Sequence, residues 1–187
     1  MYAIAANTWI WQSPLTDDSL DGLLDKIAEM GFDAVELPLE TTSDFGVDHA
    51  RQALDRTGLR AVTVGVMPDD RNLVATDAQT VLRTQQYLIE GIDIAAALGS
   101  TTLCGPFYAS VGRAWALSEV ERQRAYDDLR VNLEPVVEHA QRNGVAIGIE
   151  TLNRYETSVL NTVDQALEAL GPLLGPGLGL SLDTYHL

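Results

Sequence analysis

The chain has 187 residues, of which 46% are hydrophobic and 21% are charged, and this length and composition suit one domain with a sizeable core. It carries 12 basic and 27 acidic side chains, so its net charge is −15. Such a charge repels phosphate backbones and anionic lipid surfaces, which argues against binding to nucleic acid or to a membrane. A single cysteine, Cys104, excludes an internal disulfide. It fits a reducing cytoplasm, where we expect the protein to reside.

Residues 1–7 enter a strand-like run without a basic segment, so neither a signal peptide nor a membrane span is indicated. Residues 3–7 are the first predicted strand. Short β-rich runs predict five further strands over residues 34–38, 61–65, 101–104, 146–150 and 179–183. Their mostly continuous apolar character predicts parallel strands that are buried on both faces. Five glycines separate these runs from the helix-like segments before them, and we expect each to adopt the left-handed conformation past a helix end. They are Gly31, Gly58, Gly99, Gly144 and Gly171.

The segments between the strands have the apolar periodicity of amphipathic helices. Thr76 and Gln79 have capping-box spacing at the start of the third helix. Ser118 and Glu121 have the same spacing at the start of the fourth. Pro135 lies inside the fourth helical pattern, so we expect a kink or a break there.

Alternating strands and helices indicate an α/β protein, either a barrel or an open doubly wound sheet. A doubly wound sheet predicts a glycine-rich phosphate loop after an early strand, but residues 8–13 read Thr-Trp-Ile-Trp-Gln-Ser. Barrels carry their chemistry at the carboxyl ends of strands, where Glu36, Glu150 and Asp183 lie. We therefore expect a single domain over residues 1–187: a (β/α)8 TIM barrel truncated to about six strands, with strands seven and eight missing. Open sheet edges predict a continuation of the chain or a covering partner, such as a second copy in a homo-oligomer.

Glu150 and Asp183 each end an apolar run, and His186 follows the second of them. Carboxylate oxygens with an imidazole suit Mg²⁺, Mn²⁺ or Co²⁺. A metal beside the oxygens of a sugar would stabilise an enediolate, and a strand-end glutamate could remove the proton. Alternatively, these carboxylates cap the following helices or pair with Arg154, and the spacing alone leaves both interpretations open.

His186 lies three residues after Asp183, so a continuing strand would point the two to opposite faces. A turn after Asp183 would bring both into a pocket, whereas without it His186 would be a solvated residue. Glu156 lies in the loop after the fifth strand, where it could accept protons from sugar hydroxyls or instead bind Arg154 or solvent. We interpret His49 and His139 as structural because they fall within helical segments.

Several aromatic residues fall in or near loops after the first and fourth strands, where they could form the wall of a small-molecule pocket or cover the core. These are Trp9, Trp11, Phe107, Tyr108 and Trp115. Residues 69–71 are typical of a solvated loop. Cys104 is expected to be a small buried apolar group in a strand.

Two segments carry a family resemblance. Residues 148–161, Gly-Ile-Glu-Thr-Leu-Asn-Arg-Tyr-Glu-Thr-Ser-Val-Leu-Asn, and residues 182–186, Leu-Asp-Thr-Tyr-His, closely resemble segments of the ketose 3-epimerases. These are the D-tagatose, D-psicose and L-ribulose 3-epimerases of the xylose isomerase-like TIM barrel superfamily. The pattern Glu-x-x-Asn-Arg-x-Glu is fairly specific to that group. A weaker likeness passes through residues 30–36 and covers nearly the whole chain.

The resemblance implies an isomerase of carbohydrate metabolism that epimerises a ketose at its third carbon through an enediolate. It implies that Glu150 is the catalytic acid/base and a metal ligand, that Asp183 is a second metal ligand, and that Glu156 and His186 bind the substrate. The implied cofactor is a divalent metal, with Mn²⁺ preferred and Co²⁺ or Mg²⁺ as alternatives.

The family's remaining ligands, a histidine and a second glutamate, belong to strands seven and eight. We therefore expect the 187-residue chain alone to have little or no epimerase activity. Sibling chemistry, either inosose dehydration or hydroxypyruvate isomerisation, is an alternative within the same fold. A non-catalytic barrel fragment that acts as a binding or assembly module is the alternative from another class.

Overall fold

The computed structural model describes residues 3–112 and 114–186. Within them, strands and helices alternate along the chain, and short 3₁₀ helices follow the first strand (η1, Thr8–Ile10) and the fifth α-helix (η2, Gly171–Leu173). The main elements are β1 (Ala5–Asn7), α1 (Asp17–Glu29), β2 (Ala34–Leu39), α2 (Val47–Thr57), β3 (Arg60–Gly65), α3 (Ala78–Ala97), β4 (Thr102–Gly105), α4 (Glu119–Arg142), β5 (Ala146–Glu150), α5 (Val163–Leu170) and β6 (Leu178–Ser181).

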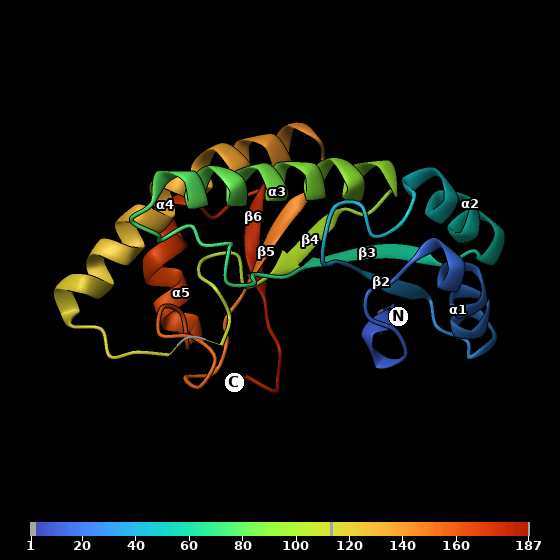
Figure 1. Cartoon of the computed structure of the whole chain (residues 1–187), viewed down its shortest axis with the longest axis horizontal. Coiled ribbons are helices and arrows are strands. Elements are labelled where there is room, and N and C mark those ends of the chain that lie inside the picture. The colour runs from blue at the N-terminus through green and yellow to red at the C-terminus, as the bar shows by residue number, and fades with distance from the viewer. Residues whose placement is uncertain (1–2, 113, 187) are drawn as a thin grey trace.

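The six strands form one parallel sheet in the order β1-β2-β3-β4-β5-β6 (Figure 1). Each strand therefore pairs with the next strand in the sequence, whereas a doubly wound sheet reverses direction at a switch point. This is the strand order of the first six units of a TIM barrel. The predicted α/β barrel architecture with about six strands is confirmed.

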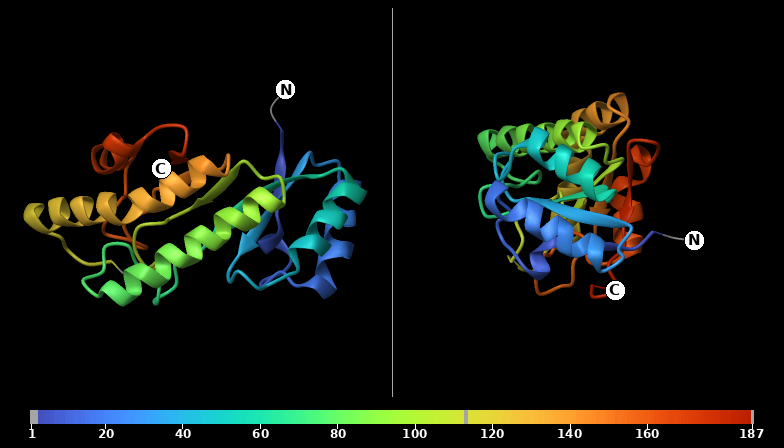
Figure 2. Two further views of the ribbon diagram at one scale, coloured as in Figure 1. Left: turned by 90° about the horizontal axis from the view of Figure 1, so that it is seen from above. Right: turned by 90° about the vertical axis from the view of Figure 1, so that its right-hand side faces the viewer.

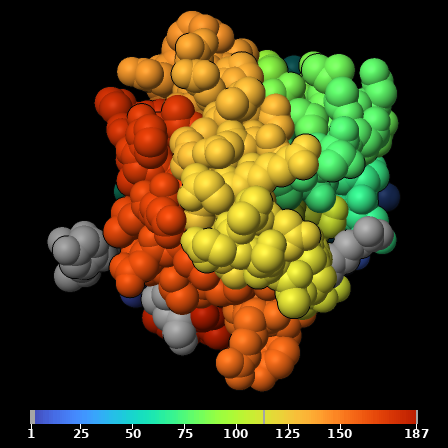
Figure 3. Space-filling model, turned by 90° about the vertical axis from the view of Figure 1, so that its left-hand side faces the viewer, coloured from blue at the N-terminus to red at the C-terminus, as the bar shows by residue number. Residues whose placement is uncertain are grey.

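The helices cover one face of the sheet. Figure 2 shows α3 and α4 side by side along the length of the sheet, and Figure 3 shows α4 flanked by α3 and α5. Gly91 of α3 lies so close to the sheet that a Cβ there would stand 3.1 Å from Leu103. Large buried side chains of the strands belong to this core: Val35, Leu37, Leu39, Leu103, Ile147, Ile149 and Leu178.

Burial of each such aliphatic side chain contributes about 1.5–3 kcal/mol to stability. Because side chains alternate along a strand, the residues between these apolar ones, such as Glu36, Cys104 and Glu150, project from the opposite face. The helix-facing side thus holds the fold together and leaves the other side for polar groups.

Four of the five predicted glycine stops are confirmed, since Gly31, Gly58, Gly99 and Gly144 have φ angles of 85°, 74°, 74° and 70°. The prediction for Gly171 is wrong. Its φ is −43°, and the chain continues there into η2. Because the helical path tightens instead of ending, no left-handed residue is needed.

The capping box of Ser118 and Glu121 at the start of α4 is confirmed. The box predicted for Thr76 is wrong, because Asp77 caps α3 by accepting hydrogen bonds from the backbone N–H groups of residues 79 and 80. Of the kink or break expected at Pro135, the break does not occur, since α4 continues through this residue. Pro135 lies on the exposed side of α4, where water can satisfy the carbonyl group that the proline leaves unpaired. Neither α4 nor any other helix of the described residues is long and apolar enough to cross a membrane.

Candidate metal and substrate site

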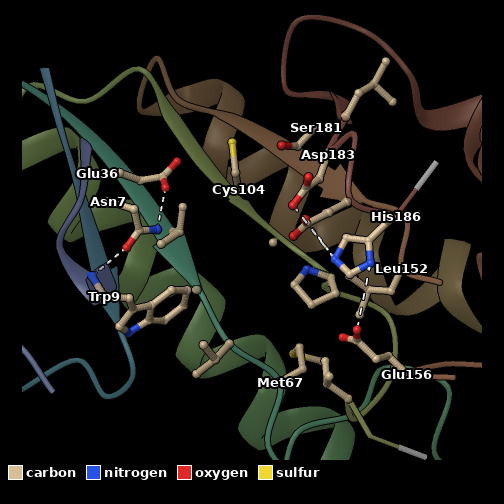
Figure 4. A pocket seen from close by; sticks show the side chains of 18 of the residues that line it. Asn7, Trp9, Glu36, Met67, Cys104, Leu152, Glu156, Ser181, Asp183 and His186 are labelled. Atoms are coloured by element: carbon tan, nitrogen blue, oxygen red, sulfur yellow. Dashed lines mark hydrogen bonds and ion pairs between the residues drawn. The ribbon is translucent and has the colours of Figure 1, made fainter. Parts of the chain in front are cut away.

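A cavity of about 840 Å³ lies at the carboxyl ends of the strands (Figure 4). All six strands, or the loops that follow them, contribute to its wall. The contributing side chains include Asn7, Glu36, Val64, Cys104, Glu150 and Ser181. Five carboxylates line the cavity, those of Glu36, Glu40, Glu150, Glu156 and Asp183, and no lysine or arginine is among its described lining residues. This position is where TIM barrels carry their active sites.

Glu150, Asp183 and His186 form a group that could hold a metal ion, because one ligand atom from each lies within 4.8 Å of the others. Glu150 is the last residue of β5, and Asp183 lies two residues beyond β6. The chain turns at that point: the N–H of His186 donates to the carbonyl of Asp183 at 3.1 Å, and the N–H of Tyr185 donates to its Oδ1 at 2.8 Å. This turn places Asp183 and His186 on the same side.

Negative charge converges on Glu150. Burial, and then the charges of Asp183, Glu36 and Glu156, raise the pKa of Glu150 to about 7. Burial likewise raises the pKa of Glu36, with a contribution from the charge of Asp183. Oxygen donors in excess of nearby cationic side chains are the donor set that a hard divalent cation requires. The described residues therefore fit a divalent metal at this position.

His186 is held by Asn153, a residue that the sequence patterns left without a role. The backbone N–H and the Nδ2 of Asn153 lie 3.2 and 3.0 Å from Nδ1 of His186. Because Nδ1 accepts these hydrogen bonds, we assign the proton of the neutral imidazole to Nε2. Nε2 lies 3.8 Å from Oε1 of Glu150 and 4.0 Å from Oδ2 of Asp183. A protonated Nε2 can donate a hydrogen bond there but cannot bind a metal.

Asn153 also reaches Glu156, to whose Oε1 its Nδ2 donates at 2.7 Å. One amide group thus links two predicted substrate-binding residues, Glu156 and His186. The side chain of His186 is only 9% exposed, so it is not the solvated residue of the alternative interpretation. The spacing of Asn153 within Glu-x-x-Asn-Arg-x-Glu was the one available signal for it, but its main partner lies 33 residues away.

The opposite wall of the cavity comes from β1, β2 and the residues that follow them (Figure 4). Nδ2 of Asn7 donates to Oε2 of Glu36 at 2.5 Å, and Oδ1 of Asn7 accepts from the N–H of Trp9 at 2.8 Å. The indole Nε1 of Trp9 donates to Oε1 of Glu40 at 3.0 Å. These contacts hold an aromatic ring and a carboxylate toward the cavity.

The five aromatic residues divide between the two interpretations. Trp9 lines the cavity, whereas Phe107 and Tyr108 are fully buried in the core. Trp11 packs against the core and lies beneath the ammonium of Lys26. Trp115 lines a different hollow, beside the loop after β5.

Two expectations about single residues are wrong. Cys104 is only half-buried and faces the cavity, because it alternates with Leu103, which occupies the helix-facing side of β4. Arg71 is not part of a freely solvated loop. Its guanidinium lies 3.5 Å above the ring of Tyr87 and donates to the carbonyls of Val66 and Glu40.

Other charged residues lie away from the cavity. Arg154 contacts Tyr155 and pairs with neither Glu150 nor Glu156 within the described residues. The interpretation of His49 and His139 as structural agrees with their positions on α2 and α4. There they contact aspartates of the neighbouring helices α1 and α3.

A parallel barrel sheet with a carboxylate–imidazole group at the carboxyl ends of its strands defines a TIM-barrel protein of the kind that binds small molecules at this end. The chain belongs to the xylose isomerase-like TIM barrel family, whose sequence profile matches residues 24–187.

Its relatives include epimerases of ketoses. The chain is 32% identical over 184 residues to a ketose 3-epimerase of Arthrobacter globiformis, covering 98% of this chain and 63% of that protein. It is 28% identical over 160 residues to an L-ribulose 3-epimerase of Methylomonas sp., covering 86% and 55%. The crystal structure of a D-allulose 3-epimerase from Methylomonas sp. superposes with a TM-score of 0.90 at 25% identity, covering 98% and 63%. The resemblance to ketose 3-epimerases is confirmed, and the chain spans less than two thirds of the length of these relatives.

Proposed function

We propose that the protein to which this chain belongs epimerises an unphosphorylated ketose at its third carbon with the help of a divalent metal. One observation carries the proposal: Glu150, Asp183 and His186 converge within an acidic cavity at the carboxyl ends of the strands. Membership of the family and similarity to ketose 3-epimerases support the reaction type. Because the chain spans 63% of the first of these relatives, the proposal concerns a complete barrel in one domain.

The charge of the cavity favours an unphosphorylated sugar. Five carboxylates line it, and the described lining residues offer no lysine or arginine to a phosphate group. A phosphate would add nearly two negative charges to this wall without a compensating partner. Neutral hydroxyl groups, in contrast, can donate hydrogen bonds to carboxylates.

The proposed metal ligands within this chain are Glu150 and Asp183. A bound divalent cation, with Mn²⁺ preferred, would stabilise negative charge that develops on the sugar oxygens. The carboxylate oxygens of Glu150 and Asp183 lie close together among other negative charges, and a divalent cation would compensate this charge. His186 is assigned to the substrate because its Nε2 carries the proton.

Glu150 is proposed to remove the proton from the third carbon. Its carboxylate ends β5 and lines the cavity beside Asp183, so a sugar bound there would lie within reach of it. The Nε2–H of His186 then donates a hydrogen bond to a substrate oxygen, and Glu156 accepts a hydrogen bond from a substrate hydroxyl group. Return of a proton to the opposite face completes the inversion, and the family resemblance assigns this step to a glutamate of strand eight.

The test uses protein expressed from the complete gene, with Mn²⁺ and a panel of ketoses that includes D-allulose. We expect epimerisation and exchange of the proton on the third carbon with D₂O. Glu150→Gln abolishes exchange, whereas Glu29→Gln, on the exposed end of α1, leaves it unchanged. Asp183→Asn weakens Mn²⁺ binding in calorimetry, which is a readout independent of turnover.

A complete protein that binds no Mn²⁺, or that exchanges no sugar proton, contradicts the proposal. The 187-residue chain alone is measured in the same assay, where little or no turnover is expected. Conversion of an inosose or of hydroxypyruvate in place of a ketose would instead favour the sibling chemistry.

A further inference from the structure

Glu36 has unused capacity to accept hydrogen bonds toward the cavity. It lies within β2, is largely buried, and lines the cavity. Asn7 is the hydrogen-bond partner of its carboxylate among the described residues, and no cationic side chain pairs with it there. An ionised carboxylate has about four acceptor positions, so a single amide leaves most of them available to a ligand.

The orientation of Asn7 is fixed. Its Oδ1 caps η1 by accepting from the N–H of Trp9, which directs its Nδ2 to Glu36. Asn7 and Glu36 are also paired residues in the register of β1 and β2. The carboxylate of Glu36 is therefore held in one place before any ligand arrives, which lowers the entropy cost of binding.

Glu36 does not belong to the candidate metal group. The proposed ligands of that group, Glu150 and Asp183, come from the end of β5 and the turn after β6. Glu36, Asn7 and Trp9 lie on the other side of the cavity (Figure 4). A linear sugar whose third carbon lies beside Glu150 can extend its remaining carbons toward this wall.

We infer that Glu36 is a further substrate-binding residue, which accepts a hydrogen bond from a hydroxyl group on the end of the ketose remote from the reacting carbon, and that Asn7 is its positioning residue. The inference rests on the proposed function. Its consequence is specificity, because a site that hydrogen-bonds a hydroxyl group rejects an analogue that lacks it.

The experiment compares D-allulose with its 5-deoxy and 6-deoxy analogues, using protein expressed from the complete gene and loaded with Mn²⁺. We expect at least one analogue to lose about tenfold to a hundredfold in kcat/KM, as suits a hydrogen bond to a charged group. The loss should lie mainly in KM. In Glu36→Leu the ratio of kcat/KM for D-allulose to kcat/KM for that analogue should fall to about one. In Glu36→Gln the same ratio should fall to an intermediate value.

Asn7→Ala should also reduce the ratio, because Glu36 loses its fixed orientation. Glu29→Gln is the control, and its ratio of the two kcat/KM values should equal that of the unmodified protein. Both Glu36 variants should still bind Mn²⁺ in calorimetry, which also shows that they are folded, and the affinity should weaken only modestly because one carboxylate charge leaves the cavity. Glu36→Gln is nearly isosteric and guards against misfolding of Glu36→Leu.

The outcomes separate the two proposals. If the unmodified protein epimerises no ketose, the proposed function fails. If it epimerises D-allulose but neither deoxy analogue is disfavoured, or the ratio is the same in the Glu36 variants, the inference about Glu36 is overturned and the proposed function stands. A loss of kcat together with Mn²⁺ affinity in Glu36→Gln would place the residue at the reacting end and would also overturn the inference.

Discussion

Nδ1 of His186 accepts hydrogen bonds from both the backbone N–H and the side-chain amide of Asn153. The two residues are 33 positions apart, one after β5 and the other after β6. The same amide donates to Glu156. A single asparagine thus fixes the orientation of an imidazole and of a carboxylate that face one cavity.

Replacing Asn153 with alanine should loosen this arrangement. Long-range ¹H–¹⁵N spectra of the metal-free protein should show the Nε2–H tautomer of His186, and a mixture of tautomers in Asn153→Ala. Loss of about 1 kcal/mol per hydrogen bond should raise the KM for the ketose roughly fivefold to tenfold. Asn143→Ala, at the exposed end of α4, serves as the control. An unchanged tautomer and KM in Asn153→Ala would remove its assigned role.

Glu150 should make the metal-free protein less stable as the pH rises. Its pKa is about 7 in the folded state and about 4.3 when unfolded, so the folded state binds more protons between these values. The free energy of unfolding therefore falls across that range, by on the order of 3–4 kcal/mol. Glu150→Gln should match the unmodified protein at pH 4 and exceed its stability at pH 8. Urea unfolding in the presence of a chelator measures both, and a Gln variant that is less stable at pH 8 would contradict the prediction.

His49 should stabilise the folded protein at low pH, and this contribution should be lost as the pH rises. Its Nε2 lies 2.9 Å from Asp21, and its Nδ1 lies 3.2 Å from Asp17, both on α1. These hydrogen bonds, chiefly that to Asp21, raise the pKa of His49. The stabilisation is complete below the unfolded pKa of about 6.5 and is lost as the pH rises through the folded value.

His49→Gln should accordingly lower the Tm more at pH 5.5 than at pH 9. Gln52→Ala, on the exposed face of the same helix, should show no such difference between the two pH values. Equal losses of Tm in His49→Gln at both pH values would show that the imidazolium charge adds nothing.

Gly148 should tolerate no side chain while Cys104 is present. A Cβ at Gly148 would stand 2.8 Å from Sγ of Cys104 and 3.4 Å from Cβ of Ser181. We expect Gly148→Ala to cost about 1–3 kcal/mol of stability, and most of that cost to disappear in the Cys104→Ala background. A double-mutant cycle from urea unfolding measures the coupling. The same cost in both backgrounds would show that the thiol is not the obstacle.

The strands were predictable because a buried parallel strand requires a continuous apolar run, and β5 begins and ends where the sequence predicts. Local signals failed where a competing local contact was available. Asp77 replaces Thr76 as the cap of α3 because a carboxylate one residue later reaches two N–H groups. Pro135 stays within α4 because its exposed position makes the lost hydrogen bond inexpensive.

Only the part of the candidate site that lies at strand ends was predictable from the sequence. Glu150 and Asp183 end apolar runs, so their proximity follows from adjacent parallel strands. The link from Asn153 to His186 depends on the path of two loops, and the stacking of Arg71 on Tyr87 joins a loop to a helix. No periodicity encodes such contacts. The pairing of Asn7 with Glu36, in contrast, was derivable, because both lie near the carboxyl ends of neighbouring strands.

The two walls of the cavity come from opposite ends of the described sequence. Within the described residues the candidate metal ligands lie between positions 150 and 186, whereas Asn7 and Glu36 lie within the first 36 residues. Opening of the β1–β2 end by local unfolding would therefore disturb the wall of Asn7 and Glu36 while leaving Glu150 and Asp183 together. During synthesis Asn7 and Glu36 leave the ribosome first, and they face Glu150 and Asp183 only after β5 and β6 have followed.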